Sequence, residues 1–285
     1  MKASKIILIS ICIAILCGAI VFQSCKKNES KKALNEETYV LTEPNKFENL
    51  FIFPVGTTLT LTADRIHFNL PVGYRLIARV YDNTKAGNVT PKVVIMSSGA
   101  VTCKCLNGVG GCSPFVKGDK TGCLMDEGCS LCQKTVNPLK VSLEILETTV
   151  IDLNIQPKFI TDADELKTIP SPSSLMFESE EVIKKLEDFL KGYNEDMNRL
   201  QYINMENIPD DYSYVPVRFL GKLILAPVLK SRCLSANLKS GMEANKDRYS
   251  CSCGAGSGCV YGQNRILGIY YCDASTCTEC TMREL

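Results

Sequence analysis

The chain has 285 residues, 45% of them hydrophobic and 22% charged, which is ordinary for a folded protein of one or two domains and excludes a disordered chain. Its formal net charge is +1, and no basic stripe interleaved with aromatic residues is present, so we expect no binding to nucleic acid. Sixteen cysteines are far more than usual, whereas His67 is the single histidine.

The first 24 residues have the layout of an export signal. Lys2 and Lys5 provide a short basic start, residues 6–21 form an uncharged apolar run, and Ser24 precedes Cys25. The apolar run is somewhat short for a stable membrane span and is typical of the core of a signal peptide. We therefore predict export from the cytoplasm.

Residues 1–27 resemble the signal of bacterial membrane lipoproteins, in which a small residue precedes the modified cysteine. The resemblance implies that residues 1–24 are removed and that Cys25 carries the acyl chains, of the palmitate type, that anchor the protein. Phe22 stands where the family usually has leucine. An uncleaved anchor is one alternative.

Cys17 is a second candidate for the modified residue, but bulky Leu16 precedes it. In the lipoprotein family, an aspartate directly after the modified cysteine favours retention in the inner membrane. Lys26 stands there instead, so the resemblance implies a cell-envelope protein of the outer membrane. Residues 25–37 are charged, contain no aromatic residue and are predicted to form a solvated tether.

The next segment, residues 38–160, is predicted to be a β domain. Alternating apolar and polar residues favour strands, and two Pro-Val-Gly sequences favour turns. The strands are expected at 57–62, 66–70, 74–81, 92–96 and 139–159. A small antiparallel sheet or sandwich that carries a cysteine module at 101–136 is the simplest arrangement.

The cysteines of the mature chain repeat a spacing. The first block is Cys103, Cys105, Cys112, Cys123, Cys129 and Cys132, and the second is Cys251, Cys253, Cys259, Cys272, Cys277 and Cys280. Both blocks have the order C-x-C, C, C, C-x2-C with gaps that differ by one or two residues, and both carry glycines before the third cysteine. We infer a duplicated module.

Each block is too short and too poor in large apolar residues to fold on a hydrophobic core alone. Three disulfides per block would supply the missing stability in an oxidising compartment. Spacing does not give the pairing, but cysteines one residue apart, such as Cys103 and Cys105, should bond elsewhere. Cys233 is left over, either as a buried thiol or as a partner of another cysteine.

Two alternatives use the same cysteines. Four-thiolate zinc sites are conceivable in each block, from Cys103, Cys105, Cys129 and Cys132 and from Cys251, Cys253, Cys277 and Cys280. A thiol redox role would use the two C-x-x-C sequences, but such motifs need a strand before and a helix after, and the sequence does not predict that context.

The remainder is predicted to be a linker at 161–178 followed by a second unit at 179–285. That unit should contain an amphipathic helix of about 20 residues capped by Ser179, a buried strand pair within 215–229, and the second cysteine module at 249–285. The expected fold class is mainly β (α+β), with small antiparallel sheets or a sandwich, one amphipathic helix and two duplicated disulfide-rich modules.

No pattern predicts a catalytic centre. A serine or cysteine nucleophile usually needs a histidine base, and His67 lies on the polar side of a predicted strand. We expect a lipid-anchored envelope protein with disulfide-stapled modules for interaction or structure, which contacts the membrane through Cys25 and binds an unidentified protein or glycan. The alternative is an envelope thiol-redox or zinc-binding protein.

Overall fold

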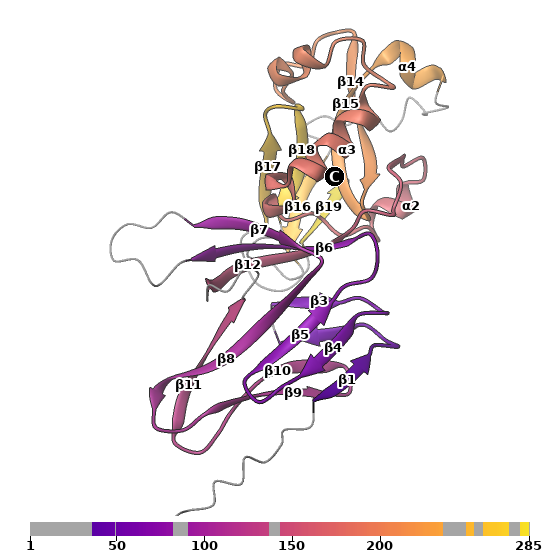
Figure 1. Cartoon of the computed structure of the whole chain (residues 1–285). Coiled ribbons are helices and arrows are strands. Elements are labelled where there is room, and N and C mark those ends of the chain that lie inside the picture. Colours follow the sequence, from indigo (N-terminus) through magenta and orange to yellow (C-terminus); the bar gives the residue numbers. More distant parts are fainter. Residues whose placement is uncertain are drawn as a thin grey trace, which may run out of the picture. The chain divides into compact units, whose positions relative to one another are not determined.

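The computed structural model describes residues 36–48, 50–81, 91–136, 143–235, 249–253, 259–273 and 280–284 (Figure 1). Most of the regular structure in these residues is β-strand, and the strands pair antiparallel except where β2 meets β10. The predicted fold class, mainly β with one amphipathic helix and two disulfide-rich modules, is confirmed.

The first half of the described chain consists of strands. They are β1 (Glu37–Val40), β2 (Asn45–Phe47), β3 (Phe51–Phe53), β4 (Thr58–Leu61), β5 (Arg65–Asn69), β6 (Tyr74–Tyr81), β7 (Lys92–Met96), β8 (Ser98–Gly108), β9 (Cys112–Lys117), β10 (Lys120–Met125), β11 (Cys129–Val136) and β12 (Leu143–Asp152). They form an eight-stranded sheet in the order β1-β4-β5-β8-β11-β12-β6-β7 and a four-stranded sheet in the order β3-β2-β10-β9.

The alternation in the sequence positions these strands. In β5, Ile66 and Phe68 are buried while His67 is exposed, because successive side chains of a strand point to opposite faces. The strands predicted at 74–81 and 92–96 match β6 and β7. Glu37, expected to belong to the tether, is instead the first residue of β1, which pairs with β4.

Phenylalanines dominate the core of this half. Phe47 stacks on Phe51 with ring centroids 5.2 Å apart, Phe51 meets Phe53 edge-on at 4.8 Å, and Phe53 contacts Phe68 at 5.5 Å. Phe53 lies on β3 and Phe68 on β5, so these contacts join the two sheets. The two sheets therefore share one apolar interior.

The second half mixes strands with short helices. The strands are β13 (Lys158–Phe159), β14 (Tyr212–Phe219), β15 (Lys222–Leu229), β16 (Tyr249–Cys253), β17 (Val260–Asn264), β18 (Ile269–Asp273) and β19 (Cys280–Glu284). The helices are α2 (Ala163–Leu166), η1 (Ser174–Glu178), α3 (Glu180–Leu190), η2 (Met197–Tyr202) and α4 (Lys230–Ser235), where η marks a 3₁₀ helix. One sheet has the order β13-β14-β15-β18-β17, and β16 pairs with β19.

The strand pair predicted within 215–229 is the β14–β15 hairpin. Leu220 and Gly221 form its two-residue turn with φ of 49° and 76°, the left-handed conformation that such a turn requires. Almost every side chain of both strands is buried, which explains why the segment is apolar throughout rather than alternating. This hairpin contributes many of the residues of the second core.

The predicted helix begins where expected but is shorter. The Ser179 hydroxyl accepts a hydrogen bond from the Val182 amide and caps α3, which ends at Leu190 after 11 residues. The side-chain amide of Asn194 donates to the carbonyls of Leu190 and Pro227, at 3.1 Å each. These bonds direct the chain onto β15, and the expected second half of the helix does not form.

Residues 161–178, expected to be a linker, are packed into the second core instead. They contain α2 and η1, and Leu166 and Ile169 are buried. The Ser173 hydroxyl donates to Glu147 of β12 at 2.7 Å. Prolines and polar residues suggested a loop, but the apolar residues between them attach this segment to the surrounding elements.

None of the helices in the described ranges combines the length and the apolar composition needed to cross a bilayer. The predicted export signal and Cys25 lie outside the described residues, as does most of the tether.

Candidate functional site

The first cysteine module is built on β8 and β11, which run side by side, with the β9–β10 hairpin between them in sequence (Figure 1). Its disulfides are Cys103–Cys123, Cys105–Cys129 and Cys112–Cys132, with Cα–Cα distances of 5.7, 5.9 and 5.9 Å. The first cysteine thus bonds to the fourth, the second to the fifth and the third to the sixth. These distances are usual for a disulfide.

The three crosslinks connect different elements. Cys103–Cys123 joins β8 to β10, and Cys112–Cys132 joins β9 to β11, so both connect the four-stranded sheet to the eight-stranded sheet. The remaining bond, Cys105–Cys129, joins β8 to β11 within one sheet. Covalent bonds therefore fix the strands of this module to one another.

The second module repeats this connectivity. Cys251 bonds to Cys272 and Cys259 to Cys280, again first to fourth and third to sixth, with Cα–Cα distances of 5.4 and 5.6 Å. Cys253 is also disulfide-bonded. The duplication inferred from the spacing thus extends to the pairing of the cysteines.

Two further cysteines have side chains outside the described residues. Cys277, the fifth of the second block, lies outside the described residues. Cys233, which belongs to neither block, lies in α4, but its side chain is outside the described residues.

The zinc quartet considered from the sequence for the first module is not the group that the structure brings together, and the quartet of the second module includes Cys277, which lies outside the described residues. The sulfurs within 4.8 Å of one another are those of Cys105, Cys112 and Cys129 and those of Cys251, Cys259 and Cys272. Each of these six sulfurs is bonded to another sulfur. Zinc binds cysteine as the thiolate, which the oxidised modules do not offer.

The first C-x-x-C sequence has a structural place. Cys129 and Cys132 both lie in β11, and they bond to different partners rather than to each other. A reactive C-x-x-C pair normally sits at the start of a helix, whose amides lower the pKa of the thiol. A strand has no such row of free amides at its start to lower the pKa of a thiol.

Close backbone packing explains the glycines of the first block. Gly108 has φ of 119°, and a Cβ on it would lie 1.8 Å from the carbonyl oxygen of Gly128. A Cβ on Gly110 would lie 2.3 Å from the carbonyl oxygen of Glu127. The two chain segments approach this closely only because the glycines have no side chain.

The two modules differ in their surroundings. In the second, Cys272 and Cys280 belong to the buried core around β14 and β15. In the first, the strand ends carry exposed apolar side chains, which we call the module-1 apolar tip. Its members are Leu106, Val109, Leu124, Met125 and Leu131.

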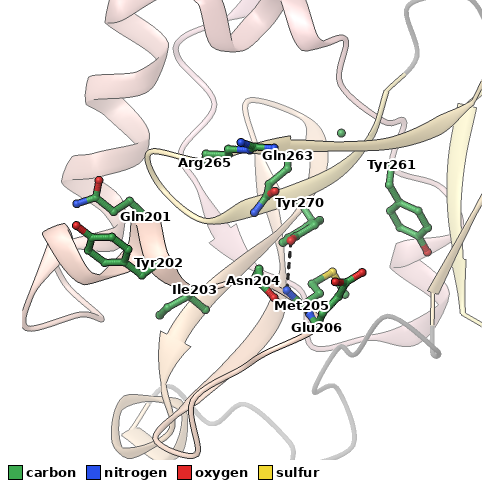
Figure 2. A pocket seen from close by; sticks show the side chains of 11 residues that line it. Gln201, Tyr202, Ile203, Asn204, Met205, Glu206, Tyr261, Gln263, Arg265 and Tyr270 are labelled. Atoms are coloured by element: carbon green, nitrogen blue, oxygen red, sulfur yellow. Dashed lines mark hydrogen bonds between the residues drawn. The ribbon is translucent and has the colours of Figure 1, made fainter.

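A separate cleft lies in the second half, between residues 201–206 and the β17–β18 hairpin (Figure 2). Its volume is about 480 Å³, within the range of small-molecule sites. We call it the tyrosine cleft. The residues that line it are Gln201, Tyr202, Ile203, Asn204, Met205, Glu206, Tyr261, Gly262, Gln263, Arg265 and Tyr270.

Hydrogen bonds from two tyrosines hold the walls of the tyrosine cleft together. The Tyr270 hydroxyl accepts a hydrogen bond from the Met205 amide at 3.3 Å, as drawn in Figure 2. The Tyr214 hydroxyl donates to the carbonyl of Gly268 at 2.7 Å, and the ring of Tyr214 meets that of Tyr270 edge-on at 5.4 Å. Burial raises the pKa of Tyr214 far above its usual value, so this hydroxyl remains a donor.

Sequence reasoning did not find the tyrosine cleft. Its residues come from two segments far apart in the chain, and neither segment contains a recognisable motif. Gly268 is the one local signal of close packing here. It has φ of 62°, and a Cβ on it would lie 2.5 Å from the carbonyl oxygen of Leu200.

Comparisons with known proteins offer no relative from which a role can be transferred. No family model matches the sequence, and neither a curated protein nor a solved structure matches it.

Proposed function

We propose that this chain is a lipid-anchored protein of the cell envelope that uses its disulfide-stapled modules to contact another envelope molecule, in an interaction or structural role rather than a catalytic one. Anchoring would occur through acyl chains on Cys25, and the outer membrane is the proposed destination. The observation that carries the proposal is the duplicated set of disulfides in the two modules.

Disulfides of this density persist in oxidising compartments outside the cytoplasm and are rare in reducing ones. The location is therefore non-cytoplasmic. The export signal and the cysteine at its end support the finer proposal of lipidation, because two or three acyl chains anchor a protein stably whereas a single chain is marginal.

The module-1 apolar tip supports an interaction role. Four of its five exposed apolar side chains lie on strands that three disulfides hold in place, and Val109 follows the end of β8 directly. A rigid surface loses little conformational entropy when it binds, and exposed apolar side chains on such a surface favour contact with a partner. We propose this tip as the surface that contacts the partner.

Metabolic labelling tests the anchor. Cells that produce the full chain are grown with an alkyne analogue of palmitate, and the wild type is compared with Cys25→Ala and with the matched control Cys17→Ala. The wild type and Cys17→Ala should be labelled and should partition into detergent, whereas Cys25→Ala should do neither. An unlabelled wild type, or a labelled Cys25→Ala, contradicts the proposal.

The same cells test the destination. Membranes separated by density should place the wild type in the outer-membrane fraction. Lys26→Asp should move the protein to the inner membrane, because the lipoprotein resemblance assigns that role to the residue after the modified cysteine. A wild type found in the inner membrane refutes the outer-membrane assignment while leaving acylation untouched.

The interaction role is tested by photo-crosslinking in intact cells. A photoreactive residue at Leu131, in the module-1 apolar tip, is compared with one at Val72, which is also exposed but lies on a turn before β6. A crosslinked product of defined mass is expected from position 131 and not from position 72. Equal products from both positions, or none from 131, count against a partner at the tip.

A further inference from the structure

We propose that the tyrosine cleft binds a short neutral saccharide. The proposal rests on the side chains that line the cleft and on the way its walls are fixed. It is independent of the acyl anchor, since a chain without lipid would have the same cleft.

The first observation is the presence of exposed aromatic side chains in the cleft. Tyr202 is 77% exposed and Tyr261 is 39% exposed. In Figure 2 the two rings lie toward opposite sides of the cleft, with Tyr270 between them. The C–H groups on the face of a sugar ring form a flat apolar surface, and a tyrosine ring stacks on such a surface while losing little rotamer entropy.

The second observation is the set of side-chain amides that line the cleft. A sugar hydroxyl both donates and accepts hydrogen bonds, and so does a side-chain amide. The amide nitrogen of Gln201 donates to the Asn198 carbonyl at 2.9 Å, which leaves its oxygen as an acceptor. In the described part of the chain, Gln263 makes no side-chain hydrogen bond, so both ends of its amide can serve a ligand.

Asn204 contributes to the cleft in a complementary way. Its side-chain oxygen accepts hydrogen bonds from the amides of Glu206 at 3.0 Å and Asn207 at 2.8 Å. These two bonds fix the turn and the orientation of the side chain, and they leave its NH₂ group as a donor. Together with the acceptor of Gln201, the cleft therefore offers both partners that a hydroxyl needs.

The charges favour a neutral ligand. Glu206 carries the one negative charge among the lining residues and Arg265 the one positive charge. A phosphate or sulfate group would be expected to meet several basic side chains, which this cleft does not provide. The Arg265 guanidinium can form paired hydrogen bonds with neighbouring hydroxyls, so a single such group suits a diol.

The cleft is also preformed. The bond between Met205 and Tyr270 joins residues 201–206 to β18, and Tyr214 on β14 bonds to Gly268 in the turn of the β17–β18 hairpin. The Tyr214 hydroxyl lies 3.4 Å from the carbonyl of Ile203 as well. Fixed walls reduce the ordering cost of binding, which matters for a ligand held by a few weak contacts.

A peptide fits the lining less well. The aliphatic lining residues, Ile203 and Met205, are buried at 1% and 6% exposure, so they offer little contact area to an apolar side chain. The accessible surface consists instead of tyrosine faces and polar groups. This composition separates the tyrosine cleft from the module-1 apolar tip, which has the opposite character.

The test uses the full mature protein, purified from membranes in a detergent without a sugar headgroup. The immobilised protein is screened against gluco-, xylo-, manno- and chito-oligosaccharides, with sulfated and sialylated glycans as the acidic comparison and a random peptide library as the peptide comparison. The strongest neutral binder is then measured by calorimetry against variants whose thermal unfolding matches the wild type.

Tyr202→Ala and Tyr261→Ala should each weaken binding by about tenfold, the loss of one stacked ring. Tyr202→Phe should stay within about twofold, because it retains the ring. Ile266→Ala is the matched control and should not change the affinity, since Ile266 is exposed on the same hairpin but does not line the cleft. This pattern supports the proposal.

Three results overturn it. One is the absence of binding to every neutral oligosaccharide at millimolar concentration. Another is binding that survives both alanine variants, which would place the ligand elsewhere. The third is a preference for acidic glycans or for peptides over neutral sugars. None of these results bears on acylation of Cys25, so the failure of this proposal is distinguishable from the failure of the anchor.

Discussion

Removing one disulfide from each module should reveal that the two modules are stabilised differently. The compared variants are Cys105→Ala/Cys129→Ala in the first module and Cys251→Ala/Cys272→Ala in the second. The two bonds close loops of similar length, with sequence separations of 24 and 21 residues. Any difference between the variants therefore reports on their surroundings rather than on loop length.

The entropic effect is nearly the same for both bonds. Closing a loop of this size restricts the unfolded chain by about 3 kcal/mol, and the two loop lengths differ in this respect by only about 0.1 kcal/mol. Of the two bonds compared, packing adds a further cost only for Cys251–Cys272. Cys272 is completely buried in the second core, and Cys251 packs against it, so replacing both sulfurs leaves a cavity that costs roughly 1–2 kcal/mol more.

We therefore expect a loss of about 3 kcal/mol in unfolding free energy for the first variant and about 4–5 kcal/mol for the second. Denaturant unfolding followed by tyrosine fluorescence measures both, because the chain has 11 tyrosines and no tryptophan. Hydrogen exchange should show that Cys105→Ala/Cys129→Ala loosens β8 and β11 while leaving β14 and β15 protected. A first-module variant that loses as much stability as the second, or more, refutes this reasoning.

Three further predictions concern single residues. Gly108→Ala should prevent the disulfides of the first module from forming correctly, because the new Cβ would clash with the Gly128 carbonyl oxygen. Gly118→Ala, at φ of 58° with open space around it, should lower the unfolding free energy by only about 1 kcal/mol. Equal yields of oxidised protein from the two variants on refolding would contradict this difference. Ser179→Ala should lower the unfolding free energy by about 1 kcal/mol through loss of the α3 cap, and an unchanged denaturation midpoint would dismiss that role. Burial and nearby carboxylates raise the pKa of Tyr271 to about 12, so its contribution to stability is complete below about pH 10 and is lost as the pH rises toward 12. Tyr271→Phe should reduce this alkaline loss of unfolding free energy. An identical dependence of unfolding free energy on pH in the variant and the wild type would argue against this role.

The sequence predicted the parts of the fold that depend on short patterns. Alternation in residues 66–70 located β5, the β-branched and aromatic residues of 74–81 located β6, and Ser179 located the start of α3. The cysteine spacing indicated two related modules, since a repeated order of six residues carries more information than any single motif. For the strands and the start of the helix, the physical cause lies within a few neighbouring residues.

The features that were missed depend on residues distant in the chain. Residues 161–178 pack because the core around β14 and β15 accepts Leu166 and Ile169, which no local pattern shows. Helix α3 ends early because Asn194 reaches Pro227 on β15. The tyrosine cleft forms only when residues 201–206 meet the β17–β18 hairpin, and so no local sequence pattern predicts it.

The measurement that tests the account most directly is peptide mapping, without reduction, of the protein isolated from native membranes after free thiols have been blocked. The repeat predicts bonds from first to fourth, second to fifth and third to sixth cysteine in both blocks, including a bond between Cys253 and Cys277. Blocked thiols at the block cysteines, or a different connectivity in the two blocks, would contradict both the oxidising location and the duplication of the module.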